Sequence, residues 1–496
     1  MQHILPFSRF FPLAAFAFLV GCPGPIENVS DAGENLDDTP QTYVFSSRFD
    51  ENHSAVSYSG QLSRHALIKA LKDYIGSIDD DTYTAGVSAA EVKANFRFFA
   101  DYKNQGGNGE EQLPYSLVDV DEAAVSTLQV SFSDIGSPVS LEEKLPDADV
   151  NFGSAGWSDG FSVAGYGAGT LSPTAVLDDM LQNLAVIVAN RADGIYEKDP
   201  AGADIEEAFL SSDGIDYQQL IQKYLDGAIL YSQATDDYLD DDIDGKGLLS
   251  DNVLQVEKAG VSEPFTSLEH SWDEAFGYFG AARDYGEYSD EEIAGKGGRP
   301  AFAKGFYDSD DDGRIDLVAE INQGHCVNAA KRDRGSSFET DFTQEAFSAF
   351  IEGRHLIAST NALSDDDLLE LRAHRDAALG AWEKAIAATV VHYLNEVLVD
   401  MDTFGTSSFS FAGYAKHFSE GLGFALALQF NPRGALSRGE LEELYRLVGR
   451  KPVAPGADAS SIAEYKQALQ NAKSLIASSF DFHDDNMGDA AGNGGW

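Results

Sequence analysis

The chain has 496 residues, of which 43% are hydrophobic, so it is long enough to bury a large core. Its 82 acidic residues outnumber the 34 basic ones and give a net charge of -48. Such a surface would repel nucleic acids and anionic lipid surfaces, which argues against both as ligands. The same excess of carboxylates is compatible with cation binding, or with salty surroundings that screen acidic surfaces.

The first residues have the pattern of an exported lipoprotein. Arg9 precedes the apolar stretch Phe10 to Val20, which is too short to span a bilayer and is typical of a signal-peptide core. Leu19-Val20-Gly21-Cys22 resembles a bacterial lipobox, which implies a signal peptide over residues 1–21 and a lipid on Cys22. Pro23 follows where an aspartate would favour inner-membrane retention, so we expect a lipid anchor in the outer membrane. A cleaved secretory signal with an incidental cysteine is the alternative.

The remainder of the chain predicts a tether followed by one large domain. Residues 22–42 are rich in Pro, Gly, Asn and Asp, which predicts a disordered tether, and the fold is expected to begin near Tyr43. No later segment is long and apolar enough for a transmembrane helix. Cys326 is the only cysteine after Cys22, so an exported chain would have no internal disulfide.

Apolar residues at three- and four-residue spacing predict a mostly α protein, a helical bundle over residues 43–480. Residues 106–170 carry many Gly, Ser and Pro, which predicts an irregular, loop-rich insertion with a small hairpin. Residues 481–496 predict a loose acidic tail. Helices are expected around 66–75, over 88–102, from 172 to about 188, over 215–231, over 268–279 with Ser267 as cap, from Ile315 onward, and over 344–362, 364–397, 410–428, 438–448 and 460–476.

The stretch Tyr307–Asp316 predicts a calcium site. Three aspartates alternate in it and Gly313 follows at the sixth position, which is the first half of a calcium loop. The loop departs from an EF-hand because Ala319 stands at the twelfth position and Glu320 comes one residue late. A solvated acidic turn is the alternative. The predicted ligands are Asp308, Asp310, Asp312, Arg314 through its carbonyl, Asp316 and Glu320.

A second alternating aspartate triplet predicts a further cation site. It is closed by Gly245, but its ninth position is Leu248, so it fits a calcium loop less well. An acidic loop between helices is the alternative. The predicted ligands are Asp240, Asp242, Asp244 and Asp251.

Three histidines lie one helical turn from a glutamate. Two such pairs turned inward in a bundle could bind iron or zinc, because imidazole and carboxylate together suit these ions. A hydrogen-bonded structural pair is the alternative reading of each. The pairs are His417 with Glu420, His270 with Glu274, and His392 with Glu396.

Other catalytic signatures are missing from the sequence. It contains no serine-hydrolase elbow, P-loop, Rossmann fingerprint or His-Glu-x-x-His motif. Ile351-Glu352-Gly353-Arg354-His355 mixes charges with a helix-disfavouring glycine, which predicts a buried ion-pair cluster. Cys326 stands too alone to be assigned as a nucleophile.

Three motifs resemble the domain of unknown function family 4856: Val56–Gln61, Glu269–Gly280, and Lys416–Glu420 with its continuation to Pro432. The resemblance covers about Tyr43 to Phe480, and it implies a bacterial lipoprotein without an established activity. The family is in turn similar to the imelysin-like proteins, which are helical periplasmic or surface proteins linked to iron uptake. Their Gly-x-His-x-x-Glu motif matches His417 and Glu420, with Ala415 at the glycine position.

Together these features predict a lipid-anchored, imelysin-like binding protein of the cell envelope. We expect it to be associated with iron acquisition, to be stabilised by calcium, and to have an envelope or uptake-system protein as partner. Two alternatives stay open: a calcium-stabilised surface module that binds a partner protein, and a metal-dependent peptidase or hydrolase with Glu274 as base.

Overall fold

The computed structural model describes residues 39–102, 111–136, 140–147 and 172–496. The chain separates into two units, Met1–Thr39 and Pro40–Trp496, and the fold is that of the second unit. The predicted signal peptide, Cys22, most of the tether and much of the insertion lie outside the described residues.

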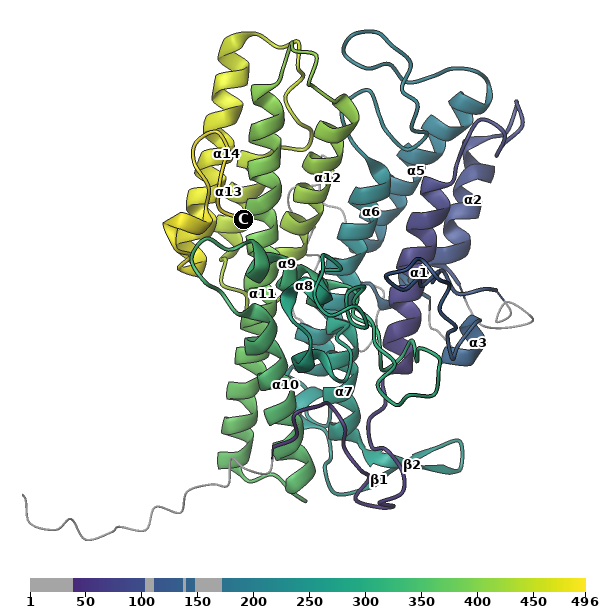
Figure 1. Ribbon diagram of the computed structural model, residues 1–496, viewed down its shortest axis with the longest axis vertical. Helices are drawn as coiled ribbons and strands as arrows, with labels where there is room; N and C mark the ends of the chain where they lie inside the picture. The colour runs from purple at the N-terminus through teal and green to yellow at the C-terminus, as the bar shows by residue number, and fades with distance from the viewer. Residues whose placement is uncertain (1–38, 103–110, 137–139, 148–171) are drawn as a thin grey trace, which may run out of the picture. The chain divides into compact units, whose positions relative to one another are not determined.

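The second unit is mostly α-helical, which confirms the predicted fold class (Figure 1). The structure is 53% helical, and its described part contains 13 α-helices and one two-stranded sheet. The elements are α1 (Ser59–Gly76), α2 (Ala89–Ala100), α3 (Phe132–Ile135), α5 (Pro173–Ala192), α6 (Tyr217–Leu225), β1 (Gln255–Lys258), β2 (Val261–Thr266), α7 (Ser267–Phe279), α8 (Asp290–Ile293), α9 (His325–Gly335), α10 (Phe342–Ser359), α11 (Asp365–Asp402), α12 (Phe411–Ala427), α13 (Arg438–Val448) and α14 (Ala459–Phe480).

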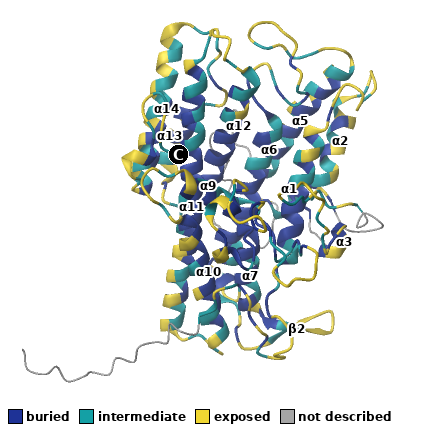
Figure 2. Cartoon of the chain, viewed as in Figure 1, coloured by how far each residue is buried: buried dark blue, intermediate teal, exposed yellow. Residues whose placement is uncertain are grey.

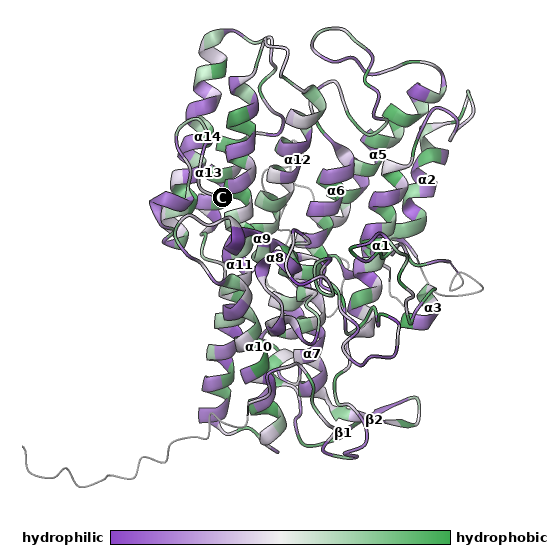
Figure 3. Cartoon of the chain, in the orientation of Figure 1, coloured by the Kyte–Doolittle hydropathy of each residue, from purple (hydrophilic) through white to green (hydrophobic). Residues whose placement is uncertain are grey.

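The long helix α11 packs against more helices than its neighbours in the chain do, namely α9, α10, α12 and α14. It contacts α10 and α12 along its length, and α12 in turn packs against α6, which contacts α1. Helices α2 and α5 pair with each other, while α14 packs on both α11 and α13. Buried residues run along α7, α10, α11 and α12, whereas exposed residues gather on loops and on α14 (Figure 2). Hydrophobic and hydrophilic residues alternate along most helices, as expected for amphipathic helices (Figure 3).

Local capping signals explain why many helices begin where the sequence predicts. The Ser172 side chain accepts the Ala175 backbone N–H at the start of α5. A capping box of Ser364 and Asp367 opens α11, whose acidic first turn suits the helix dipole. Helix α7 differs in detail, because Thr266 and not Ser267 is its N-cap.

The helix predicted from Ile315 onward is wrong. Residues 315–324 form no helix, and α9 begins only at His325. Ile315 instead makes a bridge to Thr127, and Ile321 makes one to Phe306. The apolar side chains of this stretch fill a small second core with residues of the insertion, so the burial that suggested a helix is satisfied by turns between two isolated bridges.

The acidic tail is ordered rather than loose. The Asn486 side chain accepts the Phe338 backbone N–H and donates to its carbonyl, both at 2.7 Å. Trp496 is 5% exposed, and its carbonyl accepts a hydrogen bond from Asn395 of α11 at 3.2 Å. Buried Met487 and Trp496 anchor the segment, although its composition is that of a solvated tail.

The described residues also contain one β-hairpin and several isolated β-bridges. Strands β1 and β2 pair antiparallel through a two-residue turn, Ala259–Gly260, whose φ values of 52° and 82° suit a tight hairpin. The sequence interpretation missed this hairpin. The hairpin predicted in the insertion is reduced, within the described residues, to isolated bridges such as Val118 with Ala124.

The predicted ion-pair cluster is confirmed at Arg354, which has no exposed surface. Its Nε donates to Asp273 at 2.8 Å and its Nη1 donates to Glu269 at 3.2 Å, so α10 is tied to α7. Arg48 and Tyr43, from the segment before α1, donate to Glu269 and Asp273 respectively. Breaking such a buried pair leaves uncompensated charge in the core.

We therefore expect Arg354→Met to lower the free energy of unfolding by about 3–5 kcal/mol, because two buried carboxylates lose their main counter-ion. Urea unfolding followed by circular dichroism measures it. Arg446→Met is the matched control, since Arg446 pairs with Glu443 on the exposed face of α13 and its loss should change little. Equal losses in the two variants would contradict the expectation.

Candidate functional site

The described residues contain one group of three or more His, Cys, Asp or Glu side chains whose ligand atoms all lie within 4.8 Å of one another. It consists of Asp308, Asp310 and Asp312, which are the alternating aspartates of the predicted calcium loop. Asp308 is half-buried and the other two are exposed. The structure therefore brings the three alternating aspartates of the loop together in space.

The backbone of the loop holds these carboxylates in place. Gly313 has a φ of 83°, which permits the sharp turn, and its N–H donates to Asp308 at 2.8 Å. The Asp312 N–H donates to Asp308 and to Asp310, both at 3.1 Å. Arg314 neutralises Asp312 at 2.8 Å but has no described ion pair with the other two.

Two further predicted ligands brace the loop. Glu320 is 4% exposed and accepts the N–H groups of Ser309 and Asp316, at 2.7 and 2.8 Å. Its carboxylate thereby joins the two ends of the loop. Asp316 accepts hydrogen bonds from Gln129 of the insertion and from Val318. Neither belongs to the Asp308 group.

Arginines neutralise Asp240 of the second aspartate triplet and the neighbouring Asp241. Asp240 pairs with Arg433, while Asp241 between the triplet members pairs with Arg372 and Arg375 of α11. Asp251 accepts the backbone N–H groups of the turn that follows it. Asp242 and Asp244 are exposed, and the described residues show no ligand-range group there.

His417 of α12 meets carboxylates from the neighbouring helix. A hydrogen bond of 2.8 Å joins its Nδ1 to Asp400, and Glu396 lies 4.0 Å away, both on α11. Burial alone would lower the pKa of His417, but the hydrogen bond and the charges of Asp400, Glu396 and Glu420 outweigh it and raise the pKa above its ordinary value. Asp400 was missed from the sequence, although it stands one turn after Glu396.

Glu420 is buried in the same interface, at 7% exposed. It acts on Tyr393 of α11, whose pKa is raised first by burial and then by the charge of Glu420 and a hydrogen bond to it. The predicted His392–Glu396 pair does not form, because Glu396 turns to His417. Burial lowers the pKa of His392 to about 3, so this imidazole is neutral.

His270 and Glu274 of α7 form their predicted pair, with 3.7 Å between Nε2 and Oε1. The His270 Nδ1 lies 3.0 Å from the Ser57 carbonyl, and its ring stacks on Phe265 at 4.6 Å. Gln61 donates to Glu274 at 2.7 Å. This pair and the His417 cluster do not combine into a ligand-range group among the described residues.

A cavity of about 520 Å³ opens beside the loop that carries Asp308, Asp310 and Asp312, and the sequence interpretation missed it. Asp310, Asp316 and Glu320 line it together with Asp284 and Glu287, which follow α7. Asp284 is 7% exposed, and neither of its carboxylate oxygens has a hydrogen-bond partner on another residue. Burial, with the charges of Glu287 and Glu320, raises the pKa of Asp284 to about 7.

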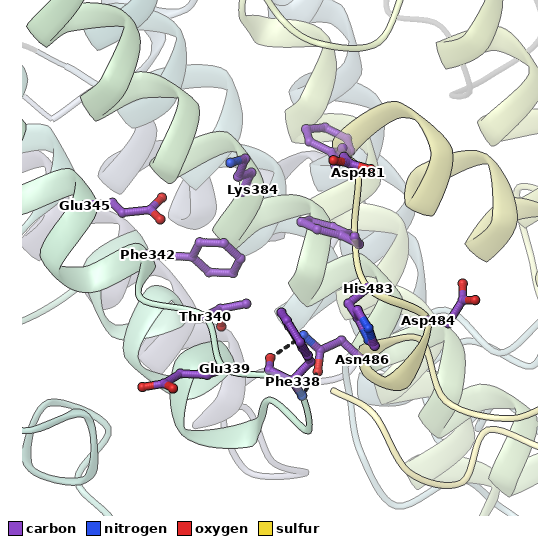
Figure 4. A pocket seen from close by; sticks show the side chains of 12 residues that line it. Phe338, Glu339, Thr340, Phe342, Glu345, Lys384, Asp481, His483, Asp484 and Asn486 are labelled. Carbon is purple, nitrogen blue, oxygen red and sulfur yellow. Dashed lines mark hydrogen bonds between the residues drawn. The ribbon is translucent and has the colours of Figure 1, made fainter. Parts of the chain in front are cut away.

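A second hollow, of about 560 Å³, lies where the end of α14 meets the segment before α10 (Figure 4). Phe338 and His483 stack there at 4.0 Å, and Lys384 extends from α11 on the opposite side. Its rim mixes Lys384 with acidic residues such as Glu345. Because the lining carries both charges, the hollow favours neither cationic nor anionic ligands.

The search for relatives identifies a family but no activity. The family model "Domain of unknown function (DUF4856)" matches residues 189–444. No curated protein and no solved structure matches the chain at a significant level. Among the described helices, none combines the length and the apolar character needed to cross a membrane.

We expect Asp400→Asn to lower the pKa of His417, because the amide removes both the charge and the ionic hydrogen bond that favour the imidazolium. Histidine-selective NMR titration measures the pKa, with His417→Gln to assign the signal. Asp402→Asn is the control, since Asp402 lies on the same helix but pairs with Lys466. An unchanged pKa in Asp400→Asn would refute the assigned cause.

Proposed function

Because the chain belongs to the DUF4856 family, whose function is unknown, we propose a function from the geometry of its sites. The protein is a lipid-anchored, imelysin-like binding protein of the cell envelope. It holds calcium in the Asp308–Glu320 loop and handles a transition-metal ion, iron in the first place, at His417. The lipobox ending at Cys22 supports the anchor, and Pro23 after it supports the outer membrane. An uptake-system protein of the envelope is the partner that this role requires.

The single observation that carries the proposal is the mutual 4.8 Å range of the ligand atoms of Asp308, Asp310 and Asp312. Three carboxylates at this separation repel one another unless a cation lies between them. Calcium prefers carboxylate and carbonyl oxygens in flexible geometry, which an exposed loop of aspartates offers. Glu320 supports the role by closing the loop through backbone hydrogen bonds.

The transition-metal part rests on the contact between α11 and α12. The imidazole of His417 with Asp400 and Glu396 supplies nitrogen and oxygen donors, which suit iron and zinc. Glu420 adds a further carboxylate beside Tyr393. Ala415, at the imelysin glycine position, is fully buried and packs with Ile205 and Leu210 of a neighbouring loop. The alanine is thus accommodated by packing on the side of α12 away from these donors.

The second candidate is a calcium-stabilised surface module that binds a partner protein. The observation in its favour is that, among the described residues, the aspartate loop alone meets the mutual ligand range. A peptidase ranks below both. It would use Glu274 as the base, and Glu274 already accepts a hydrogen bond from Gln61.

We expect calcium to raise the melting temperature of the full-length protein in detergent, because calcium binds the folded state. At a calcium concentration one hundred times Kd, this binding adds about 2.7 kcal/mol to the free energy of unfolding. Asp308→Asn combined with Asp312→Asn should remove most of this gain. The control is Asp242→Asn with Asp244→Asn, which removes two exposed aspartates from the other loop. A melting curve indifferent to both calcium and chelator would refute calcium binding.

Plasma mass spectrometry on protein purified without chelator or nickel tests the transition-metal part. We expect iron or zinc beside calcium, and we expect His417→Ala to lose the iron or zinc while His270→Ala keeps it. Transition-metal content that survives His417→Ala would refute the site. Calcium alone in the wild type would favour the partner-binding module.

A further inference from the structure

The cavity beside the calcium loop contains a buried acid with no counterpart. Asp284 is as buried as other acids of the core, some of which have several donors. Asp333, for example, accepts the N–H groups of Phe342 and Thr343 and the hydroxyl of Thr340. Both oxygens of Asp284 are inaccessible to solvent and receive no hydrogen bond from another residue. A carboxylate left in this state costs free energy that a missing partner would recover.

The surroundings of Asp284 exclude most protein partners for it. The positive charge of Arg299 lowers the pKa of Asp284, but Arg299 donates its Nε and Nη2 hydrogen bonds to Glu292, both at 2.8 Å. Arg283 next to it donates Nε to the Tyr58 hydroxyl and lies over the Tyr58 ring. Arg283 also lines the cavity, but five acids line it as well, Asp284, Glu287 and Glu320 among them, so its wall is mainly negative.

Geometry favours a small bare cation as the missing partner. A metal ion approaches a carboxylate oxygen at about 2.3–2.6 Å, closer than the roughly 2.8 Å of a water or ammonium donor. It can therefore reach oxygens that solvent does not. Glu320 Oε2 accepts a single hydrogen bond, from Asp316, so it keeps a lone pair for a cation. The Tyr288 hydroxyl is another buried oxygen without a partner, close enough to Asp284 that the carboxylate charge helps to raise its pKa, after burial.

We propose that this cavity is a second divalent-cation site of the calcium class, with Asp284 as its direct ligand and with Glu287 and Glu320 as carboxylates that line the same cavity outside mutual ligand range. None of these three residues belongs to the Asp308 group, although Asp310 of that group lines the same cavity, so the two sites adjoin. Calcium suits it better than magnesium, because an irregular wall and a cavity of about 520 Å³ permit several oxygen ligands and waters without octahedral geometry. The inference does not require the aspartate loop to be occupied.

Calcium titration calorimetry on the full-length protein in detergent tests the site. We expect the wild type to bind one more calcium ion than Asp284→Asn. In Glu287→Gln, the affinity for that additional ion should fall at least tenfold. Glu287 is exposed, so its variant keeps the test valid if Asp284→Asn fails to fold. Glu291→Gln is the matched control, because it removes one exposed negative charge nearby without touching the cavity.

The loop variant Asp308→Asn with Asp312→Asn separates this inference from the proposed loop site. It should keep the ion that Asp284→Asn loses. Without calcium, Asp284→Asn should be at least as stable as the wild type, since it removes a buried charge with no partner. Wild-type calcium stoichiometry and affinity in both Asp284→Asn and Glu287→Gln would overturn the proposal.

Discussion

The buried contact of Arg354 with Glu269 and Asp273 is the constraint on which the arrangement of helices depends. The two acids lie on one face of α7 and the arginine comes from α10, so the contact fixes these helices against each other. The segment before α1 joins through Tyr43 and Arg48. Any one of these charges alone in the core would be strongly destabilising, so the three segments have to assemble together.

Helix α7 links this contact to the loop that carries Asp308, Asp310 and Asp312. It ends at Gly280, whose φ of 86° suits glycine and whose backbone comes so close to Gln323 that a Cβ would lie 2.3 Å from its carbonyl oxygen. Backbone hydrogen bonds then join Gln323 to Gly280 and Arg283 to Ala319, at 2.9 and 2.8 Å. The distance between the acids that follow α7 and those that follow the loop is thus set by backbone pairing. Mutually repelling carboxylates are held together by bonds that do not involve them.

The sequence predicted those features whose signal lies within one segment, and it failed for features that depend on contact with a distant segment of the chain. Capping residues such as Ser364 predict helix starts because cap and helix are neighbours in the chain. Ile315 and Ile321 predicted a helix wrongly because their spacing indicates burial, and they are buried here by the insertion packing on a segment of turns. The same limit applies to the candidate sites. Spacing finds His417 with Glu420, but only the approach of α11 adds Asp400.

The acid surplus of the chain explains why a cation is a natural completion of this structure. With 82 acids and 34 bases, most carboxylates of the chain cannot each have an arginine or lysine of their own. Asp333 solves the problem with backbone donors, and Glu383 accepts one backbone N–H while burial raises its pKa to about 7. Asp284 has neither an arginine nor donors from other residues, and it faces further carboxylates across a cavity. A divalent ion satisfies several such groups at once.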